Sequence, residues 1–203
     1  MRPRNVAIAI MAKAPIPGLA KTRLIPSIGA HAAAVLQERL TERAAATALA
    51  ADTGPVTVWC TPDPGHASFR ELVVRHKVAL KRQPDGDLGQ RMLATTDGPT
   101  LVIGTDCPAL TVEHLRAAAE ALRGGADVVL IPAEDGGYVL IGARLARQEL
   151  FEGMVWGTAT VLADTRERIA ALGLTCIELP ALWDVDTECD LARLELELPE
   201  LAL

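Results

Sequence analysis

Three basic residues, Lys13, Lys21 and Arg23, lie close together near the N-terminus in a loop that contains two prolines and Gly18. Two lysines and an arginine at this spacing can surround a pyrophosphate with positive charge and backbone N–H groups. The loop lacks the spacings of a Walker A loop and of a G-x-G-x-x-G dinucleotide turn. A solvated basic turn is the alternative interpretation, because charged runs usually lie at the surface. The candidate nucleotide contacts in this loop are Lys13, Ala14, Pro15, Gly18, Lys21 and Arg23.

Asp106 follows the most hydrophobic predicted strand, residues 101–104, and lies between Gly104 and Pro108. A carboxylate in this position is well placed to bind Mg²⁺ or Mn²⁺, which prefer carboxylate oxygens and substrate phosphates. The same residues also suit a turn that leads into a helix, with Asp106 capping backbone amides. The neighbouring Thr105 is a candidate nucleotide contact.

Asp184 and Asp186 alternate on a segment that reads as extended. Their side chains therefore point the same way and repel each other unless a cation or a hydrogen-bond donor lies between them. Thr187 and Asp190 resemble a helix capping box, which explains those two residues but not the two aspartates before them. We therefore expect this segment to supply a second metal ligand that completes a site with Asp106.

Two further segments combine glycines with polar residues. Gly136 and Gly137 permit a close approach of the backbone to a ligand, but a tight turn between strands uses the same pair. Residues 83–92 form a glycine-containing loop that leads into a helix, and its amides are suited to a base or a phosphate. Trp156 suits the core as well as the wall of a ligand site. The nucleotide-binding candidates from these segments are Gln83, Gly89, Arg91, Gly136 and Gly137.

Strand-length apolar runs alternate along the chain with stretches of helical period, a pattern typical of a parallel sheet covered by helices. The fold class that we predict is α/β, a three-layer α/β/α sandwich with a mostly parallel, mixed sheet, in one domain over residues 1–203. In open α/β sheets, ligands bind beyond the carboxyl ends of the strands, which is where the candidate residues follow. The predicted strands are residues 6–11, 56–60, 78–81, 101–104, 127–131, 138–141 and 175–179. The predicted helices are residues 30–51, 67–75, 111–123 and 158–172, and a last helix from Thr187.

Bulk composition narrows the class of function. A net charge of −6 disfavours broad nucleic-acid binding, which needs a concentrated basic face. The first apolar run, residues 6–12, is far shorter than the ~20 residues of a membrane-spanning helix. The same run lacks the small-residue cleavage site of a signal peptide, so we expect a cytoplasmic protein. The four cysteines show no C-x-x-C pair and no zinc-ligand spacing, so we expect reduced thiols.

Taken in order, these motifs resemble the glycosyltransferase-A superfamily, also called the nucleotide-diphospho-sugar transferase fold. Within it the chain is similar to the bacterial family DUF2064, described as radical-SAM/selenodomain-associated glycosyltransferase-like proteins. It also resembles the 2-phospholactate guanylyltransferases and, more distantly, the molybdenum-cofactor nucleotidyltransferases. The segments that carry the resemblance begin at Lys13, Lys21, Gly104, Asp135, Trp156 and Trp183 and cover nearly the whole chain.

The resemblance implies roles for particular residues. Lys21 and Arg23 are expected to steady the phosphates and Asp106 to bind the metal, which makes these three the candidate catalytic residues. Asp186, together with Asp184, is expected to supply the second metal contact. The chain departs from the family pattern at Glu188 and Cys189, where relatives commonly have proline and glutamate.

A metal-dependent transferase that uses a nucleotide is therefore expected, with Mg²⁺ or Mn²⁺ as cofactor. The family description favours glycosyl transfer from a nucleotide-sugar to a small-molecule acceptor. Two alternatives stay open: a nucleotidyltransferase that releases pyrophosphate from a nucleoside triphosphate, and a catalytically inactive nucleotide-binding regulatory protein. No Ser-His or Cys-His pair suggests a protein nucleophile. We expect a monomer or homodimer with no nucleic-acid or membrane partner.

Overall fold

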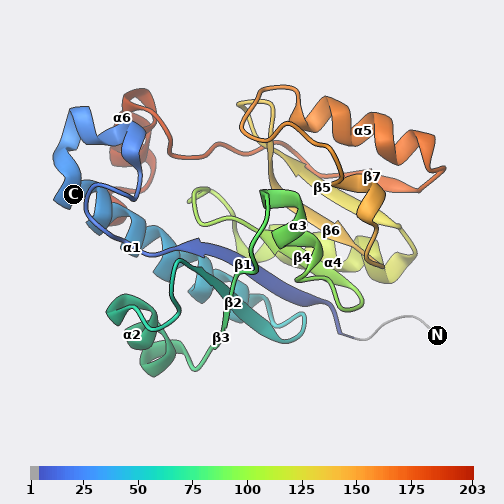
Figure 1. Ribbon diagram of the computed structural model, residues 1–203, viewed down its shortest axis with the longest axis horizontal. Coiled ribbons are helices and arrows are strands. Elements are labelled where there is room, and N and C mark those ends of the chain that lie inside the picture. Colours follow the sequence, from blue (N-terminus) through green and yellow to red (C-terminus); the bar gives the residue numbers. More distant parts are fainter. Residues whose placement is uncertain (1–4) are drawn as a thin grey trace.

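The computed structural model describes residues 5–203 and contains one seven-stranded sheet with the strand order β3-β2-β1-β4-β6-β5-β7 (Figure 1). Strand β6 is antiparallel to both of its neighbours, β4 and β5, and every other neighbouring pair is parallel. The predicted mostly parallel, mixed sheet is therefore confirmed. The strands are β1 (Ala7–Lys13), β2 (Val56–Thr61), β3 (Ala79–Arg82), β4 (Thr100–Ile103), β5 (Val128–Pro132), β6 (Tyr138–Ala143) and β7 (Cys176–Glu178).

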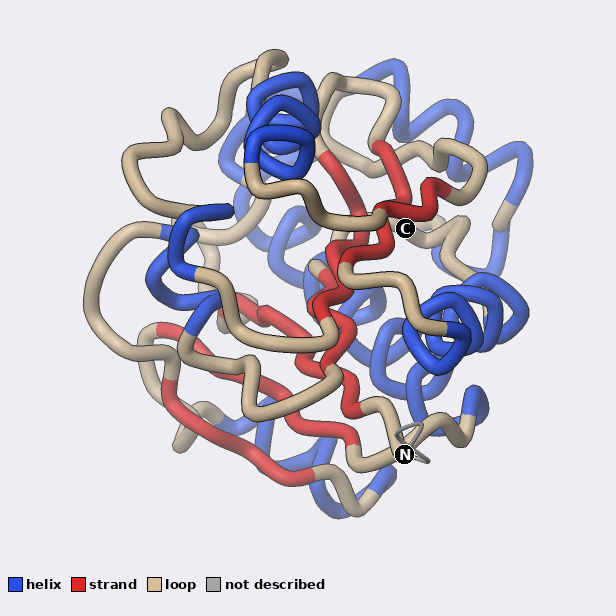
Figure 2. The backbone as a smooth tube through the Cα atoms, turned by 90° about the vertical axis from the view of Figure 1, so that its right-hand side faces the viewer, coloured by secondary structure: helices blue, strands red, loops and turns tan. Residues whose placement is uncertain are grey.

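Helices cover both faces of this sheet, which makes the predicted three layers (Figure 2). On β1, Ile8 and Ile10 pack into the cluster that contains residues of α1, α2 and α4, whereas Ala9 packs on the opposite face with residues of α3 and α5. This alternation is the period of two that a strand buried on both faces requires. The helices are α1 (Ile25–Ala51), α2 (Ala67–His76), α3 (Leu88–Leu93), α4 (Val112–Gly124), α5 (Val161–Ala171) and α6 (Glu188–Glu197).

The predicted strands and helices are present, with most ends shifted by a few residues. The largest difference is at the start of α1, which was predicted at residue 30 and begins at Ile25. Gly29 has φ 80° and breaks the helix there, so the regular part of α1 coincides with the predicted one. Three short 3-10 helices, η1 (Thr22–Leu24), η2 (Gln148–Leu150) and η3 (Pro199–Leu201), were not predicted.

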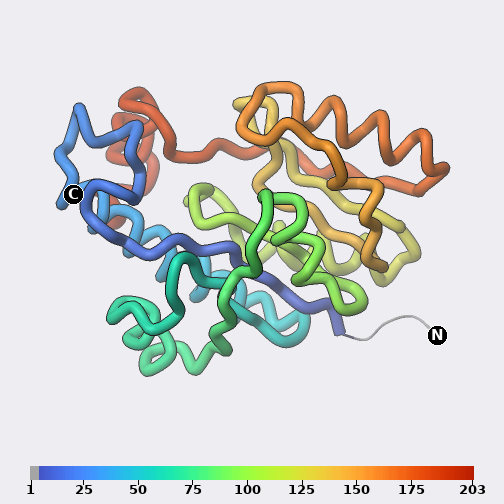
Figure 3. Tube along the Cα trace, viewed as in Figure 1, coloured from blue at the N-terminus to red at the C-terminus, as the bar shows by residue number. Residues whose placement is uncertain are grey.

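Strand direction brings the candidate segments together at the carboxyl ends of the parallel strands. Parallel pairing of β1 with β4 sets Ile10 opposite Ile103, so the loop after β1 and the turn after β4 leave the sheet side by side. The chain after β7 returns across the same edge, where the Leu182 N–H donates to the Pro132 carbonyl at 3.0 Å. Figure 3 shows the first part of α1, in blue, next to the last segment of the chain, in red.

The two outermost strands of the sheet, β3 and β7, are short and polar. Strand β3 has four residues, with Lys81 and Arg82 exposed, and the Lys81 ammonium lies 5.1 Å from the centre of the Trp59 ring. Strand β7 has three residues, and Glu178 pairs with Arg166 at 2.7 Å.

The four cysteines are free, and no helix in residues 5–203 is long and apolar enough to cross a membrane.

Asp127, just before β5, ties together the ends of three strands. Its carboxylate accepts hydrogen bonds from the Thr175 N–H and hydroxyl, at 3.0 and 2.7 Å, and pairs with Arg144 after β6. The hydrogen bonds from Thr175 and the charge of Arg144 lower the pKa of Asp127. A lowered pKa stabilises the fold above the ordinary aspartate range and stops doing so as pH falls.

We predict that Asp127→Asn lowers the free energy of unfolding by about 1 kcal/mol at neutral pH, because one charged acceptor is lost. The difference from the wild type should shrink as pH falls below about 4. Urea unfolding at two pH values measures both effects, and Asp97→Asn, at an exposed aspartate, is the matched control. A difference that is independent of pH would contradict the role assigned to the carboxylate.

Candidate functional site

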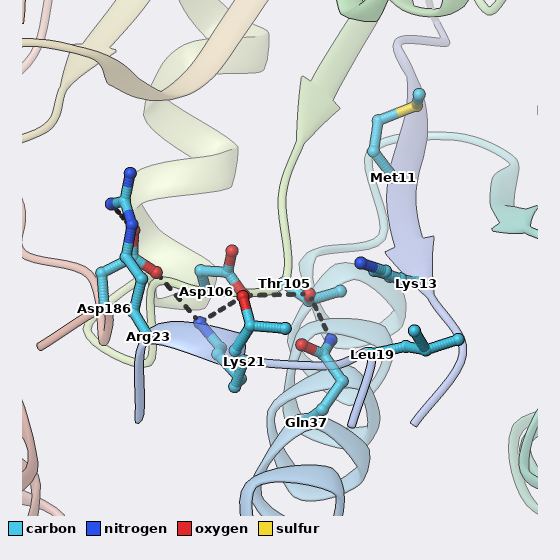
Figure 4. A pocket seen from close by; sticks show the side chains of 10 residues that line it. Met11, Lys13, Leu19, Lys21, Arg23, Gln37, Thr105, Asp106 and Asp186 are labelled. Atoms are coloured by element: carbon cyan, nitrogen blue, oxygen red, sulfur yellow. Dashed lines mark hydrogen bonds and ion pairs between the residues drawn. The ribbon is translucent and has the colours of Figure 1, made fainter. Parts of the chain in front are cut away.

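A pocket of about 230 Å³ opens at the carboxyl ends of β1 and β4 (Figure 4). The loop after β1 and η1 form one side, the turn after β4 the floor, and the segment before α6 the other side. The lining residues are Met11, Lys13, Leu19, Lys21, Thr22, Arg23, Gln37, Thr105, Asp106 and Asp186. Five charged residues predicted from separate parts of the chain therefore line one pocket, namely Lys13, Lys21, Arg23, Asp106 and Asp186, whereas Asp184 is not among its lining residues.

Lys21 is the centre of this pocket. Its ammonium lies 2.7 Å from Asp106 Oδ1 and 3.5 Å from Asp186 Oδ1, and it donates to the Val185 carbonyl at 2.6 Å. The Lys21 side chain is only 4% exposed, so these three acceptors replace the water that a lysine normally binds. Buried Ala20 and Leu24 on either side anchor the loop and hold the side chain inward.

The segment that carries Asp184 and Asp186 is fixed by the residues between them. Trp183 and Val185 are buried in a cluster with Leu36 and Leu40 of α1, so the alternation of an extended chain turns both aspartates to the other side. The Val185 N–H donates to the Asp106 carbonyl at 2.9 Å, which joins this segment to the turn after β4. Asp186 also pairs with Arg23 at 3.2 Å, and the Arg23 side chain is 69% exposed.

The aspartates affect one another's ionisation. Burial, and then the charges of Asp135, Asp186 and Asp106, raise the pKa of Asp184 to about 6. Burial also raises the pKa of Asp186, while the nearby Lys21 and Arg23 act in the opposite direction. The carboxylates of Asp106, Asp184 and Asp186 thus outnumber the two cations that pair with them, Lys21 and Arg23.

A divalent cation fits the chemistry of Asp106 and Asp186, although not as a site made of protein ligands alone. Residues 5–203 contain no group of three acidic, histidine or cysteine side chains arranged to hold a metal. Mg²⁺ is, however, commonly held by one or two carboxylates together with substrate phosphates. The Lys21 ammonium lies where the two carboxylates face each other, which is the place predicted for a cation.

Gln37, on the buried stripe of α1, is a pocket residue that the sequence analysis missed. Its amide donates to the Thr105 hydroxyl at 2.9 Å and to the Thr41 hydroxyl at 3.3 Å. The Thr105 hydroxyl in turn lies 3.4 Å from Asp106 Oδ1, so it is engaged inside the protein. A glutamine between Leu36 and Leu40 in an otherwise apolar stripe is the signal that could have identified it.

Other predicted nucleotide contacts do not line this pocket. Gln83 is buried, and its amide donates to the Trp59 carbonyl of β2 at 2.9 Å and to the Ala12 carbonyl of β1 at 3.3 Å. Arg91 donates to the Gly86 carbonyl at 2.9 Å. Gly89 packs so closely under Trp156 that an added Cβ would lie 2.7 Å from the indole ring. In the loop after β1, Ala14 is buried, Pro15 is partly exposed and Gly18 is exposed.

Gly136 and Gly137 lie in the turn between β5 and β6, as the alternative interpretation expected. The Gly136 N–H donates to the Ala133 carbonyl at 3.2 Å, and the Gly137 N–H donates to the Asp135 side chain at 2.9 Å. Gly136 has φ 92°, and an added Cβ would lie 2.3 Å from the Ala159 carbonyl oxygen. Both amides therefore already have partners, and Gly136 is needed for the turn itself.

A second pocket, also of about 230 Å³, adjoins the first and shares Arg23 and Asp186 with it. Its walls come from the turn between β5 and β6, from α3 and from the segment before α5. The Tyr138 hydroxyl and the Trp156 indole N–H are buried there without a hydrogen-bond partner in residues 5–203. The remaining lining residues are Leu88, Asp135, Gly137, Tyr138, Trp156, Gly157, Thr158 and Val161.

Comparison of the fold with solved structures gives clear neighbours. A crystal structure of a candidate nucleotide-diphospho-sugar transferase from Desulfovibrio desulfuricans G20 is 29% identical, with a TM-score of 0.79 over 90% of this chain and 82% of that chain. A nucleotidyl transferase from Methanothermobacter thermautotroptrophicus is 16% identical, with a TM-score of 0.62 over 97% and 99%. Rv0371C from Mycobacterium tuberculosis H37Rv, in complex with manganese, is 14% identical, with a TM-score of 0.51 over 96% and 100%. The latter two likenesses concern the fold alone.

Sequence comparison gives one family. The family described as "Uncharacterized protein conserved in bacteria (DUF2064)" matches residues 44–158, which include β2 to β6 and the Asp106 turn. No curated protein sequence matches the chain.

We predict that Asp184→Asn stabilises the protein at neutral pH, because it removes a partly buried charge that its neighbours repel. A raised pKa means that the folded state is favoured while Asp184 is protonated and is penalised as pH rises through about 6. The gain should be about 1 kcal/mol near pH 7, since water screens part of the repulsion, and small near pH 4. Urea unfolding across this range measures the difference, and an Asp184→Asn protein that is less stable than the wild type at pH 7 would contradict the prediction.

Proposed function

The chain belongs to the DUF2064 family, and from this premise we propose that it is a transferase that acts on a nucleotide or nucleotide-sugar in the pocket beside β1 and β4. The observation that carries the proposal is the grouping of Lys13, Lys21 and Arg23 with Asp106 and Asp186 at the carboxyl ends of parallel strands. Such a site combines positive charge for phosphates with hard oxygen ligands for a divalent cation.

Lys13 and Arg23 are the cations most available to an incoming phosphate. Within residues 5–203, the Lys13 side chain has no ion pair or hydrogen bond, and it lines the pocket from the end of β1. Arg23 pairs with Asp186 but is largely exposed, and its guanidinium can bind two phosphate oxygens at once. Lys21 is already engaged with carboxylates, so we assign the first contact with phosphate to Lys13 and Arg23.

Asp106 and Asp186 are proposed to hold Mg²⁺ or Mn²⁺ together with oxygens of the nucleotide. The manganese-bound relative of the same fold supports this choice of ion class. When bound, the cation would neutralise charge that develops on the departing phosphate. The chain's own part is to bring the two carboxylates together, which the Val185 N–H does by donating to the main-chain carbonyl of Asp106.

The acceptor is proposed to lie in the second pocket, across Asp186 from the donor. The acceptor itself attacks, since the chain offers no activated nucleophile at the site. Burial raises the pKa of the neighbouring Cys107 thiol to about 12, so this cysteine stays protonated at neutral pH. We therefore propose that the group passes directly from donor to acceptor, without a covalent intermediate on the protein.

Glycosyl transfer from a nucleotide-sugar is the reaction we favour, because the Desulfovibrio relative is described as a nucleotide-diphospho-sugar transferase. Nucleotidyl transfer is the second candidate, supported by the Methanothermobacter nucleotidyl transfer enzyme of the same fold. The released product separates them: glycosyl transfer from a diphosphate-linked sugar yields a nucleoside diphosphate, whereas nucleotidyl transfer from a triphosphate yields pyrophosphate.

We predict that Asp106→Ala lowers turnover by at least about 100-fold while the protein stays folded, because a residue that stabilises developing charge is lost. The measurement is release of nucleoside diphosphate or pyrophosphate from a panel of nucleotide-sugars and nucleoside triphosphates, with Mn²⁺ and a mixture of small-molecule acceptors. Asp97→Ala, at an exposed aspartate outside both pockets, is the matched control. Full activity of the Asp106→Ala protein would refute the assigned role. Thermal stabilisation of the wild type by nucleotide and Mn²⁺, without product from any donor, would instead favour a regulatory protein.

A further inference from the structure

Lys21 occupies the position in which the proposed function needs a divalent cation. We propose that the Lys21 ammonium is the resident counter-ion of Asp106 and Asp186, and that metal binds these carboxylates tightly only after the ammonium has left them. This inference rests on the proposed function, since it concerns the same pocket. Its consequence is an order of events in which metal and nucleotide bind together better than metal alone.

The contacts of the ammonium are complete. Three acceptors, Asp106 Oδ1, Asp186 Oδ1 and the Val185 carbonyl, lie at 2.7, 3.5 and 2.6 Å, and an ammonium has three N–H donors. The contacted oxygens are the ones that the two carboxylates turn toward each other (Figure 4). A second cation between the same oxygens would lie within a few ångströms of the ammonium, and the two would repel each other.

The backbone of Lys21 indicates that its present position is imposed. Lys21 has φ 45° and ψ 45°, a left-handed conformation that residues other than glycine seldom adopt. Such a conformation persists where surrounding contacts over-determine it, and here the contacts are the two carboxylates and the Val185 carbonyl. Release of the ammonium would therefore also let the backbone relax.

The same pocket can bring a phosphate close to the ammonium. Gly18 and Leu19 are exposed, and Lys13 and Arg23 lie in the same pocket. An incoming phosphate is an alternative anionic partner for the ammonium, so nucleotide would draw Lys21 away from the aspartates and leave them to the metal. Because coupling between two ligands is reciprocal, metal would strengthen nucleotide binding equally.

Binding of Mn²⁺ alone tests the inference, with free Mn²⁺ followed by electron paramagnetic resonance in the absence of nucleotide. In Lys21→Met the ammonium is replaced by an apolar chain of similar length, and we expect Mn²⁺ to bind at least about tenfold more tightly than to the wild type. Lys21→Arg keeps the charge and should bind Mn²⁺ as weakly as the wild type. Lys13→Met removes one positive charge from the same pocket without freeing a carboxylate, so its Mn²⁺ affinity should change less than about threefold.

The pattern among the variants decides the outcome. Mn²⁺ binding to Lys21→Met that is no tighter than to the wild type would overturn the inference, as would equal tightening in Lys13→Met. Absence of Mn²⁺ binding in every variant would overturn it as well, because unpaired carboxylates should then hold the ion. Thermal melting without metal checks folding, and Lys21→Gln, which keeps a polar group without charge, replaces Lys21→Met if that protein does not fold.

This experiment is independent of turnover. A wild type with no transferase activity but with the expected Mn²⁺ pattern would refute the proposed function and support the counter-ion role of Lys21. Activity combined with unchanged Mn²⁺ affinity in Lys21→Met would do the reverse.

Discussion

A buried ammonium group must be surrounded by acceptors, and in this protein that requirement joins three distant parts of the chain. Lys21 comes from the loop after β1, Asp106 from the turn after β4, and Val185 and Asp186 from the segment before α6. Together these acceptors replace the water that the ammonium would otherwise bind. The arrangement therefore requires the three segments to be in register.

The topology of the sheet brings these three segments together. Parallel pairing of β1 and β4 brings two strand ends together, and β6 runs the other way between β4 and β5. The turn between β5 and β6 thus returns to the same ends of the strands and supplies Asp135, whose charge adds to the effect of burial in raising the pKa of Asp184. The basic loop and four carboxylates, those of Asp106, Asp135, Asp184 and Asp186, therefore lie at the same ends of the strands, and the second pocket lies beside them.

The sequence predicted the elements well because their patterns are strong. Strands such as β1 and β5 are buried on both faces, and Thr111 caps α4 where a capping residue was expected. The grouping of Lys21, Arg23, Asp106 and Asp186 in one pocket also followed from the rule that ligands bind at strand ends.

Burial and pairing could not be predicted. Nothing local distinguishes a lysine that is 4% exposed from one in water, and the strand order that inserts β6 beside β4 is a property of the whole sheet. Gln37 acquires its place only when the tip of β4 meets α1. The predicted contacts at Gln83, Gly89 and Arg91 lie elsewhere because loop glycines and polar side chains serve local turns as readily as ligands.

The short strands at the two margins of the sheet have a consequence for self-association. Unpaired backbone groups on a long, apolar outer strand invite another chain to add on, and repeated addition leads to fibres. Here the outer strand β3 carries two adjacent basic residues, Lys81 and Arg82, and the other outer strand, β7, has only three residues, of which Glu178 pairs with Arg166. Two copies meeting along β3 would bring like charges together, and copies meeting along β7 would gain few hydrogen bonds. Neither outer strand is therefore suited to extension of the sheet by another copy.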